Sequence, residues 1–223
     1  MAEVNLFPLF LSLRVAATAT LLALLIGLPI AYYLAKSKGK IADLVDTVIT
    51  LPVVLPPTVL GYYLLVLLGR QSPIGQFVEQ QFNMTIVFTP TGAVIAALVV
   101  SIPFLIKSAK ASFASVDQNV VNAAKILGRS DLNIFFTVIL PLAWRGIASG
   151  LTLSFARALG DFGATLMVAG SIPNETMTMP IAIYDALLAG NRDLANVLVL
   201  IMTATSITVL YVINRLERKV VKG

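Results

Sequence analysis

Long apolar runs alternate with short polar stretches along the whole chain. Most of these runs reach about 18 residues, the length at which a helix can cross the hydrocarbon core of a bilayer. The pattern predicts one all-helical membrane domain over residues 1–223, with five transmembrane helices. The expected spans cover about 9–35, 41–69, 92–109, 142–170 and 194–214, and a polar interval occupies 110–141.

Basic residues flank the apolar runs unevenly. Lysines and arginines gather at 36–40, within 107–145 and after 213, whereas the opposite ends carry only Arg14, Arg70 and Arg192. Because basic residues stay on the cytoplasmic side, we expect the N-terminus outside and the C-terminus in the cytoplasm. This sidedness requires the weakly apolar run at 142–170 to cross. No basic region precedes the first run, so it is expected to remain as a span and not to act as a signal peptide.

The second apolar run contains three prolines, Pro52, Pro56 and Pro57. Proline leaves backbone carbonyl groups without helical partners, and lipid supplies no substitute donors. We therefore expect this span to be broken and to face other protein or a water-filled path. Two interpretations remain open: part of a transport pathway, or a kinked helix that serves only packing.

The fourth run carries Arg157 and Asp161 at positions i and i+4, which predicts a shared helix face and an ion pair. Each charge alone would cost about 2.5 to 3.5 kcal/mol at mid-span, so both must face protein or water. Gly163 and nearby alanines would let another helix approach closely. The pair is either a structural contact between helices or part of a pathway or its gate.

The polar interval predicts an amphipathic helix over residues 117–135. Asp117 is a good N-cap, and Val121, Ala124 and Gly128 fall on one face. Pro141 ends the interval before the next apolar run. By itself this is either an ordinary surface helix or a docking element for another protein.

Composition excludes several classes of protein. The chain is 58% hydrophobic and 12% charged, far too apolar for a water-soluble domain. It has no His and no Cys, which excludes thiolate or imidazole metal sites, histidine acid–base catalysis and disulfides. No phosphate-binding Gly-x-x-x-x-Gly-Lys motif occurs, so any nucleotide must bind to another subunit. We expect no cofactor, no metal, no catalytic site and no nucleic-acid partner.

Four stretches together resemble the permease family of molybdate ABC importers, from about residue 10 onward. They are LPVVLPPTVLGYYLLVLLGR (51–70), the loop from Asn122 to Pro141, SFARALGDFGAT (154–165) and IPNETMTMPIAIY (172–184). Asn122 stands where the family's loop has Glu, Val138 where it has Ile, and Asp161 where Glu is more usual. The loop is common to import permeases, and the Arg157–Asp161 stretch is shared with sulfate and thiosulfate permeases. The proline-rich and IPNET stretches favour molybdate.

The resemblance implies a multi-pass subunit of a prokaryotic inner membrane that transports molybdate, and also tungstate, without catalysing a reaction. Its partners would be a second permease copy, two ATP-hydrolysing subunits and an external binding protein. The coupling residues carried over are Asn122, Ala123, Ala124, Gly128, Leu140 and Pro141. The pathway or gate candidates are Pro56, Pro57, Arg157, Asp161 and Gly163.

Two other readings remain. A sulfate or thiosulfate permease is the nearest one. The other is a secondary transporter or channel, which would need intramembrane carboxylates and often has internal repeats. Asp161 is the single acidic residue deep in a predicted span, and no repeat is evident.

Overall fold

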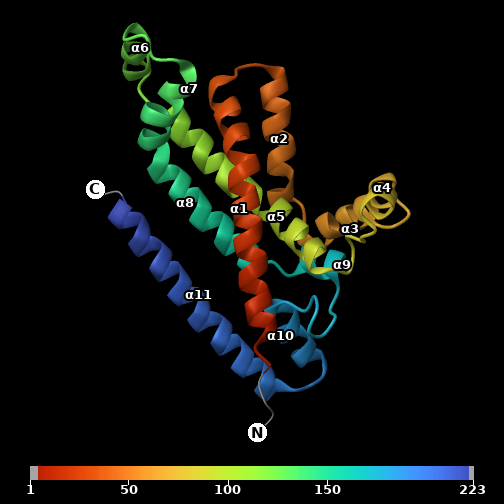
Figure 1. Cartoon of the computed structure of the whole chain (residues 1–223). Helices are drawn as coiled ribbons and strands as arrows, with labels where there is room; N and C mark the ends of the chain where they lie inside the picture. The colour runs from red at the N-terminus through yellow and green to blue at the C-terminus, as the bar shows by residue number, and fades with distance from the viewer. Residues whose placement is uncertain (1–4, 221–223) are drawn as a thin grey trace.

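The computed structural model describes residues 5–220, and every regular element in that range is a helix (Figure 1). The helices are α1 (Phe7–Lys36), α2 (Lys40–Val54), α3 (Pro57–Leu68), α4 (Pro73–Phe82), α5 (Pro90–Ala114), α6 (Gln118–Ile126), α7 (Asp131–Ile134), α8 (Leu140–Leu159), α9 (Gly163–Ala169), α10 (Met179–Leu188) and α11 (Arg192–Val220), with a π-helical turn, η1 (Phe135–Ile139), between α7 and α8. The all-helical fold class predicted from the sequence is confirmed.

Helices α1, α5 and α8 form the centre of the bundle, with α5 against both of the others. Small residues make the crossing of α5 and α8 close. A Cβ atom added to Gly150 would lie 2.9 Å from Cβ of Ser108, and the Ser108 hydroxyl donates a hydrogen bond of 2.7 Å to the carbonyl of Gly146. Gly146 and Gly150 have the spacing that lets membrane helices approach backbone to backbone.

Four helical stretches are long and apolar enough to cross a membrane: Phe7–Lys36, Pro90–Ala114, Asp131–Leu159 and Arg192–Ile213. A fifth candidate is the pair α2 and α3, which bends by 116° at its break. The predicted break in the second span is therefore confirmed. Leu55 and Pro56 each precede a proline, which disfavours helical backbone, and both are extended, with ψ of 139° and 136°.

Two helix boundaries differ from the sequence prediction. The helix expected over 117–135 is two helices, because Gly128 adopts a φ of +76° and closes α6 with a Schellman turn, in which Arg129 N–H donates to the Ala124 carbonyl. The run expected at 142–170 is part of a helical stretch that starts at Asp131 and ends at Leu159. Residues 160–162 then interrupt it before α9.

The outer helices are less tightly packed. Helices α3 and α4 project sideways from the bundle, and α11 runs along its edge with most of its surface uncovered (Figure 1). Helix α10 is attached to the start of α1, since the Met179 N–H donates to the buried Ser12 hydroxyl at 2.8 Å. The bundle thus has one dense centre and several helices whose outer faces are free within residues 5–220.

Candidate functional site

The α6–α7 segment (residues 117–134) extends beyond one end of the bundle (Figure 1). Side-chain caps begin both helices: the Asp117 carboxylate accepts from Asn119 N–H at 2.8 Å, and the Ser130 hydroxyl accepts from Asn133 N–H at 3.3 Å. Only Val121 and Ile134 are buried in these two helices. Most of the segment is therefore exposed surface, held in shape by its own caps and turn.

The exposed tip of this segment is apolar. Ile126, Leu127 and Leu132 are 87%, 80% and 73% exposed. Three large aliphatic side chains on one short protruding segment form a surface that favours contact with another protein. Gly128 lies among them with no heavy atom within 4 Å of an added Cβ, so it leaves the tip unobstructed.

The predicted loop residues do not all lie together. Asn122 and Ala123 are exposed, Ala124 is half-buried, and Asn122 accepts a hydrogen bond from Gln118 at 3.3 Å. Leu140 and Pro141, by contrast, are the first residues of α8. Pro141 lacks the N–H that would bond to the carbonyl of Thr137. Thr137 lies in the π-helical turn η1, which ends two residues before Pro141.

The interruption between α2 and α3 (residues 55–56) lies close to the one between α8 and α9 (residues 160–162). We call the place where they meet the paired break. An added Cβ on Gly163 would lie 3.0 Å from Cβ of Pro57, directly after the first interruption. One turn further along α3, a Cβ on Gly61 would lie 2.7 Å from Cβ of Met167 and 3.0 Å from Cα of Ala164. The absence of side chains at the two glycines lets α3 and α9 touch backbone to backbone.

Asp161 links the two helices on either side of the second interruption. Its side chain is 1% exposed, and its Oδ1 accepts from Arg157 Nη1 at 3.3 Å. Its Oδ2 accepts from the Thr165 N–H at 2.9 Å and from the Thr165 hydroxyl at 2.7 Å. The predicted ion pair is confirmed, but Asp161 lies beyond the end of α8, so the two residues do not share a helix face. The carboxylate instead caps α9.

Arg157 is the more accessible member of the pair, with 29% of its side chain exposed. Its guanidinium has several N–H groups, and its one hydrogen bond to a side chain among residues 5–220 goes to Asp161. Among the pathway candidates, Pro57, Gly163, Arg157 and Asp161 all lie at the paired break, and Pro56 is part of the first interruption. This arrangement provides a closely packed, charged junction inside an apolar bundle.

A second group of charges, apart from the Arg157–Asp161 pair, lies between α2 and α5. Asp46 Oδ2 accepts a hydrogen bond from Lys107 Nζ at 2.7 Å and forms an ion pair with Lys110 Nζ at 3.3 Å. Sequence reasoning treated both lysines as flanking charges and overlooked Asp46, although a carboxylate inside a predicted apolar span is itself a signal. Asp46, Lys107 and Lys110 are called the Asp46 cluster below.

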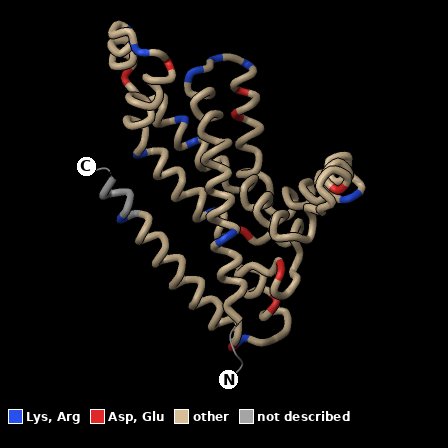
Figure 2. Tube along the Cα trace, in the orientation of Figure 1, with Lys and Arg blue, Asp and Glu red and all other residues tan. Residues whose placement is uncertain are grey.

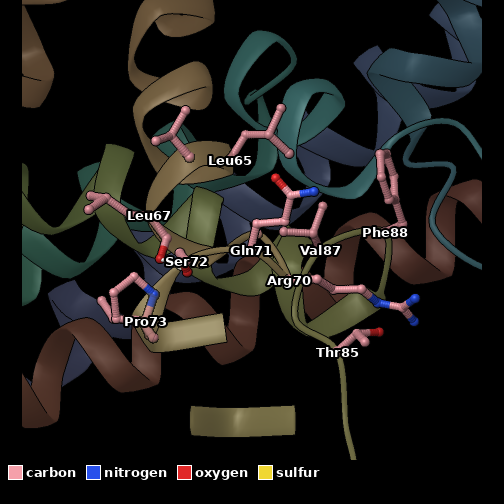
Figure 3. A pocket seen from close by; sticks show the side chains of 12 residues that line it. Leu65, Leu67, Arg70, Gln71, Ser72, Pro73, Thr85, Val87 and Phe88 are labelled. Atoms are coloured by element: carbon pink, nitrogen blue, oxygen red, sulfur yellow. Dashed lines mark hydrogen bonds between the residues drawn. The ribbon is translucent and has the colours of Figure 1, made fainter. Parts of the chain in front are cut away.

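A cavity of about 1090 Å³ opens between the end of α3, the turn into α4 and residues 85–88 (Figure 3). Its walls are largely apolar, and the polar side chains among them are Arg70, Gln71, Ser72 and Thr85. Phe88, which also lines it, has a φ of +61° and donates its N–H to the carbonyl of Val168 on α9 at 2.9 Å. The sequence did not predict this cavity. Between residues 5 and 220 no group of three or more acidic side chains is placed to hold a metal ion.

The chain was compared with known proteins and structures. The family model for the binding-protein-dependent transport system inner membrane component matches residues 23–222. A putative molybdenum transport system permease protein of Bacillus subtilis (strain 168) is 41% identical over 210 residues, which are 93% of this chain and 92% of the relative. The molybdenum transport system permease protein of Escherichia coli (strain K12) is 42% identical over 174 residues, covering 78% of this chain and 76% of the relative.

Solved structures give the same fold at low sequence identity. A chain of the MetNI methionine ABC transporter in an inward-facing conformation superposes with a TM-score of 0.75 at 16% identity, covering 99% of both chains. A chain of a bacterial ABC transporter that imports alginate gives a TM-score of 0.70 at 16% identity, covering 98% of this chain and 80% of that one. This protein belongs to the family of inner membrane components of binding-protein-dependent transport systems, and its fold is that of an ABC importer permease.

Proposed function

We propose that this chain is the permease subunit of an ABC importer for molybdate, and that tungstate is also accepted. The relatives named as molybdenum transport permeases are 37% to 42% identical over most of the chain, which supports this substrate. A sulfate or thiosulfate permease is the alternative that the Arg157–Asp161 stretch leaves open. Membership of the permease family favours either of these over a secondary transporter or channel.

ATP hydrolysis is assigned to a separate subunit pair that binds the α6–α7 segment. The single observation that carries this proposal is the exposed apolar tip formed by Ile126, Leu127 and Leu132. Burying such side chains in a cleft of the partner would stabilise the complex, and the Gly128 turn would leave room for close contact. Asn122, Ala123 and Ala124 lie on the same segment, whereas Leu140 and Pro141 join it to α8 and would transmit its movement.

The sidedness is supported by the distribution of charge. Basic residues gather at the end of the bundle that carries the α1–α2 connection and the α6–α7 segment, and few lie at the end with α10 (Figure 2). The positive-inside rule then assigns the first end to the cytoplasm, with the N-terminus outside and the C-terminus inside. An external binding protein would deliver the anion near α10. A second copy of the chain would complete the pathway at the interface between the two permeases.

The paired break is the proposed place where the pathway opens and closes. Pro56, Pro57 and Gly163 permit the close contact of α3 with α9, and Arg157 and Asp161 supply charge next to it. A conformational change that separates α3 from α9 would expose the guanidinium of Arg157 further. One partly exposed arginine suits an anion that has to pass and not be retained.

The test is ATP-dependent uptake of labelled molybdate into vesicles that hold the permease, its ATPase and its binding protein. The variant Gly128→Arg places a bulky charge at the apolar tip, and we expect uptake to be lost while the permease still inserts. Gly190→Arg is the matched control, because Gly190 has a φ of +73° and an equally open surrounding, at the end of α10. It carries the same backbone strain but lies at the opposite end of the bundle from the α6–α7 segment, so it should leave binding of the ATPase unchanged, whereas Gly128→Arg should abolish it.

Two results would change the proposal. If excess sulfate abolished molybdate uptake while excess tungstate lowered it only slightly, the chain would be assigned to the sulfate permeases. Uptake that needs no ATP, or that Gly128→Arg leaves untouched, would remove the assignment of the α6–α7 segment as the contact with the ATPase.

A further inference from the structure

Helix α2 is held on the bundle by a narrow strip of contacts. Ala42 is its only buried residue, and Val45 and Ile49 are half-buried against the central core. The opposite side is exposed, including Leu44 and Val48 at 64% and 60%. Because so little apolar surface is buried, hydrophobic contact alone attaches this half of the broken span weakly.

Asp46 lies in the middle of that strip and connects it to α5. Its Oδ2 accepts a hydrogen bond from Lys107 Nζ at 2.7 Å and forms an ion pair with Lys110 Nζ at 3.3 Å. The two lysines are three residues apart on one helix, so they share a face. Among residues 5–220, these are the only ion pairs that join two long helices distant in the sequence, because the other three connect residues at most nine positions apart.

The environment makes these charges responsive to small movements. The Asp46 side chain is 23% exposed and the lysine side chains 43% and 33%, so all three are partly removed from water. Attraction between partly buried charges is screened less than between exposed ones, and separating the partners leaves a charge without compensation. The second oxygen, Oδ1, is buried and accepts no hydrogen bond from the described residues. The lysines are therefore the partners that stabilise this carboxylate in the observed conformation.

The two ends of α2 differ in conformational freedom, because glycine precedes the helix and prolines follow it. Before it, Gly39 has a φ of +142° with no heavy atom within 4 Å of an added Cβ, so its role there is conformational freedom. After it, the extended residues Leu55 and Pro56 separate it from α3. Helix α3 is fixed to α9 by the close contact at Gly61, whereas α2 is free to turn at Gly39.

We propose that Asp46 is a positioning residue for the transport cycle. Its ion pairs with Lys107 and Lys110 hold α2 against α5 in this conformation and separate when the permease changes conformation, with α2 turning about Gly39. The inference rests on the proposed function, since it assigns the Asp46 cluster to the cycle of that transporter. It concerns residues that the family resemblance did not single out.

The first test compares charge removal with charge exchange in the complete complex. Asp46→Asn is expected to lower the molybdate taken up per ATP hydrolysed by about fivefold, because the conformation held by the cluster is less populated. The double variant Asp46→Lys with Lys107→Asp retains one carboxylate facing two ammonium groups and should recover to within about twofold. Asp43→Asn, an exposed carboxylate on the same helix, is the matched control and should behave like wild type.

The second test locks the cluster. The chain has no cysteine, so Asp46→Cys with Lys107→Cys introduces its only two thiols, and a short bis-methanethiosulfonate can join them through disulfides that reduction breaks. We expect uptake by the cross-linked complex to be at least about tenfold lower than by the same variant before cross-linking, and to return to that level on reduction. Uptake that is equal in the cross-linked and reduced complexes would overturn the proposal, as would an exchanged pair no better than Asp46→Asn.

A separate readout keeps this inference distinct from the proposed function. Spin labels at Val48→Cys on α2 and Ala111→Cys on α5 report the distance between the helices with and without ATP and vanadate. Wild-type complex that transports no molybdate would overturn the substrate assignment, and a distance that still changes would support the movement of α2. An unchanged distance in a complex that transports would overturn the role of Asp46.

Discussion

The α6–α7 segment and the paired break both interrupt the apolar pattern, but the first is exposed and the second is buried. The segment extends beyond the bundle, and apart from Val121 and Ile134 most of its side chains are exposed, with Ile126 at 87%. The paired break lies inside, where Asp161 is 1% exposed and each of its oxygens has a donor. An exposed segment can tolerate change without affecting the fold, whereas a buried charge must keep all its partners.

Removing the Asp161 carboxylate should have the largest effect on stability. Asp161→Ala leaves Arg157 without its partner and α9 without its cap, so we expect the free energy of unfolding to fall by about 3 kcal/mol. Unfolding of the purified permease by SDS in mixed micelles measures it. Asp117→Ala removes a comparable cap from the exposed segment and should cost about 1 kcal/mol. Equal losses at the two positions would contradict the comparison.

A methyl group at the contact of α3 with α9 should have the next largest effect. Gly61→Ala forces the helices apart, since its Cβ would lie 2.7 Å from Cβ of Met167. Overpacking of this kind costs about 2 kcal/mol, read from the same SDS titration. The control is Gly160→Ala, whose Cβ would meet its nearest neighbour, the Ala156 carbonyl oxygen, at 3.5 Å. If Gly61→Ala proved as stable as this control, the contact would be looser than the structure has it.

A change at the apolar tip should affect assembly and leave the fold intact. Leu127→Ser is expected to weaken binding of the ATPase by about tenfold, or 1.4 kcal/mol, because a contact buried only in the complex is lost. The free energy of unfolding of the permease alone should change by less than about 0.5 kcal/mol. Leu188→Ser alters a similarly exposed leucine at the end of α10 and should not weaken binding. Binding in detergent, measured by titration of labelled ATPase, separates the two variants.

The smallest effect is expected from a single hydroxyl at the paired break. Thr165→Val keeps the shape and the N–H bond to Asp161 but removes the hydroxyl bond of 2.7 Å, which should cost about 1 kcal/mol. Thr137→Val removes a hydroxyl that donates to the Asn133 carbonyl within an exposed turn of helix, and its cost should be near zero. A larger loss for Thr137→Val in the SDS titration would reverse the proposed difference between the two regions.

Local sequence signals were enough to find the elements of both regions, but not their geometry. The prolines at 56 and 57 identified the break in the second span, and the spacing of Arg157 and Asp161 identified an ion pair. The expectation of a shared helix face for that pair was wrong, because a carboxylate near a helix end can cap the next helix. Asp46 was overlooked because its partners lie about 60 residues further along, where no local pattern connects them.

The sequence by itself determined the all-helical membrane fold, the number of candidate spans, the broken second span and the family. These follow from the length of apolar runs, the placement of prolines and motif spacing, which are local properties of the chain. Tertiary structure alone decided that Gly61 and Gly163 bring the two interruptions together, that Asp161 caps α9, and that Asp46 joins α2 to α5. Those contacts depend on how helices far apart in the sequence pack in three dimensions, which local patterns do not specify.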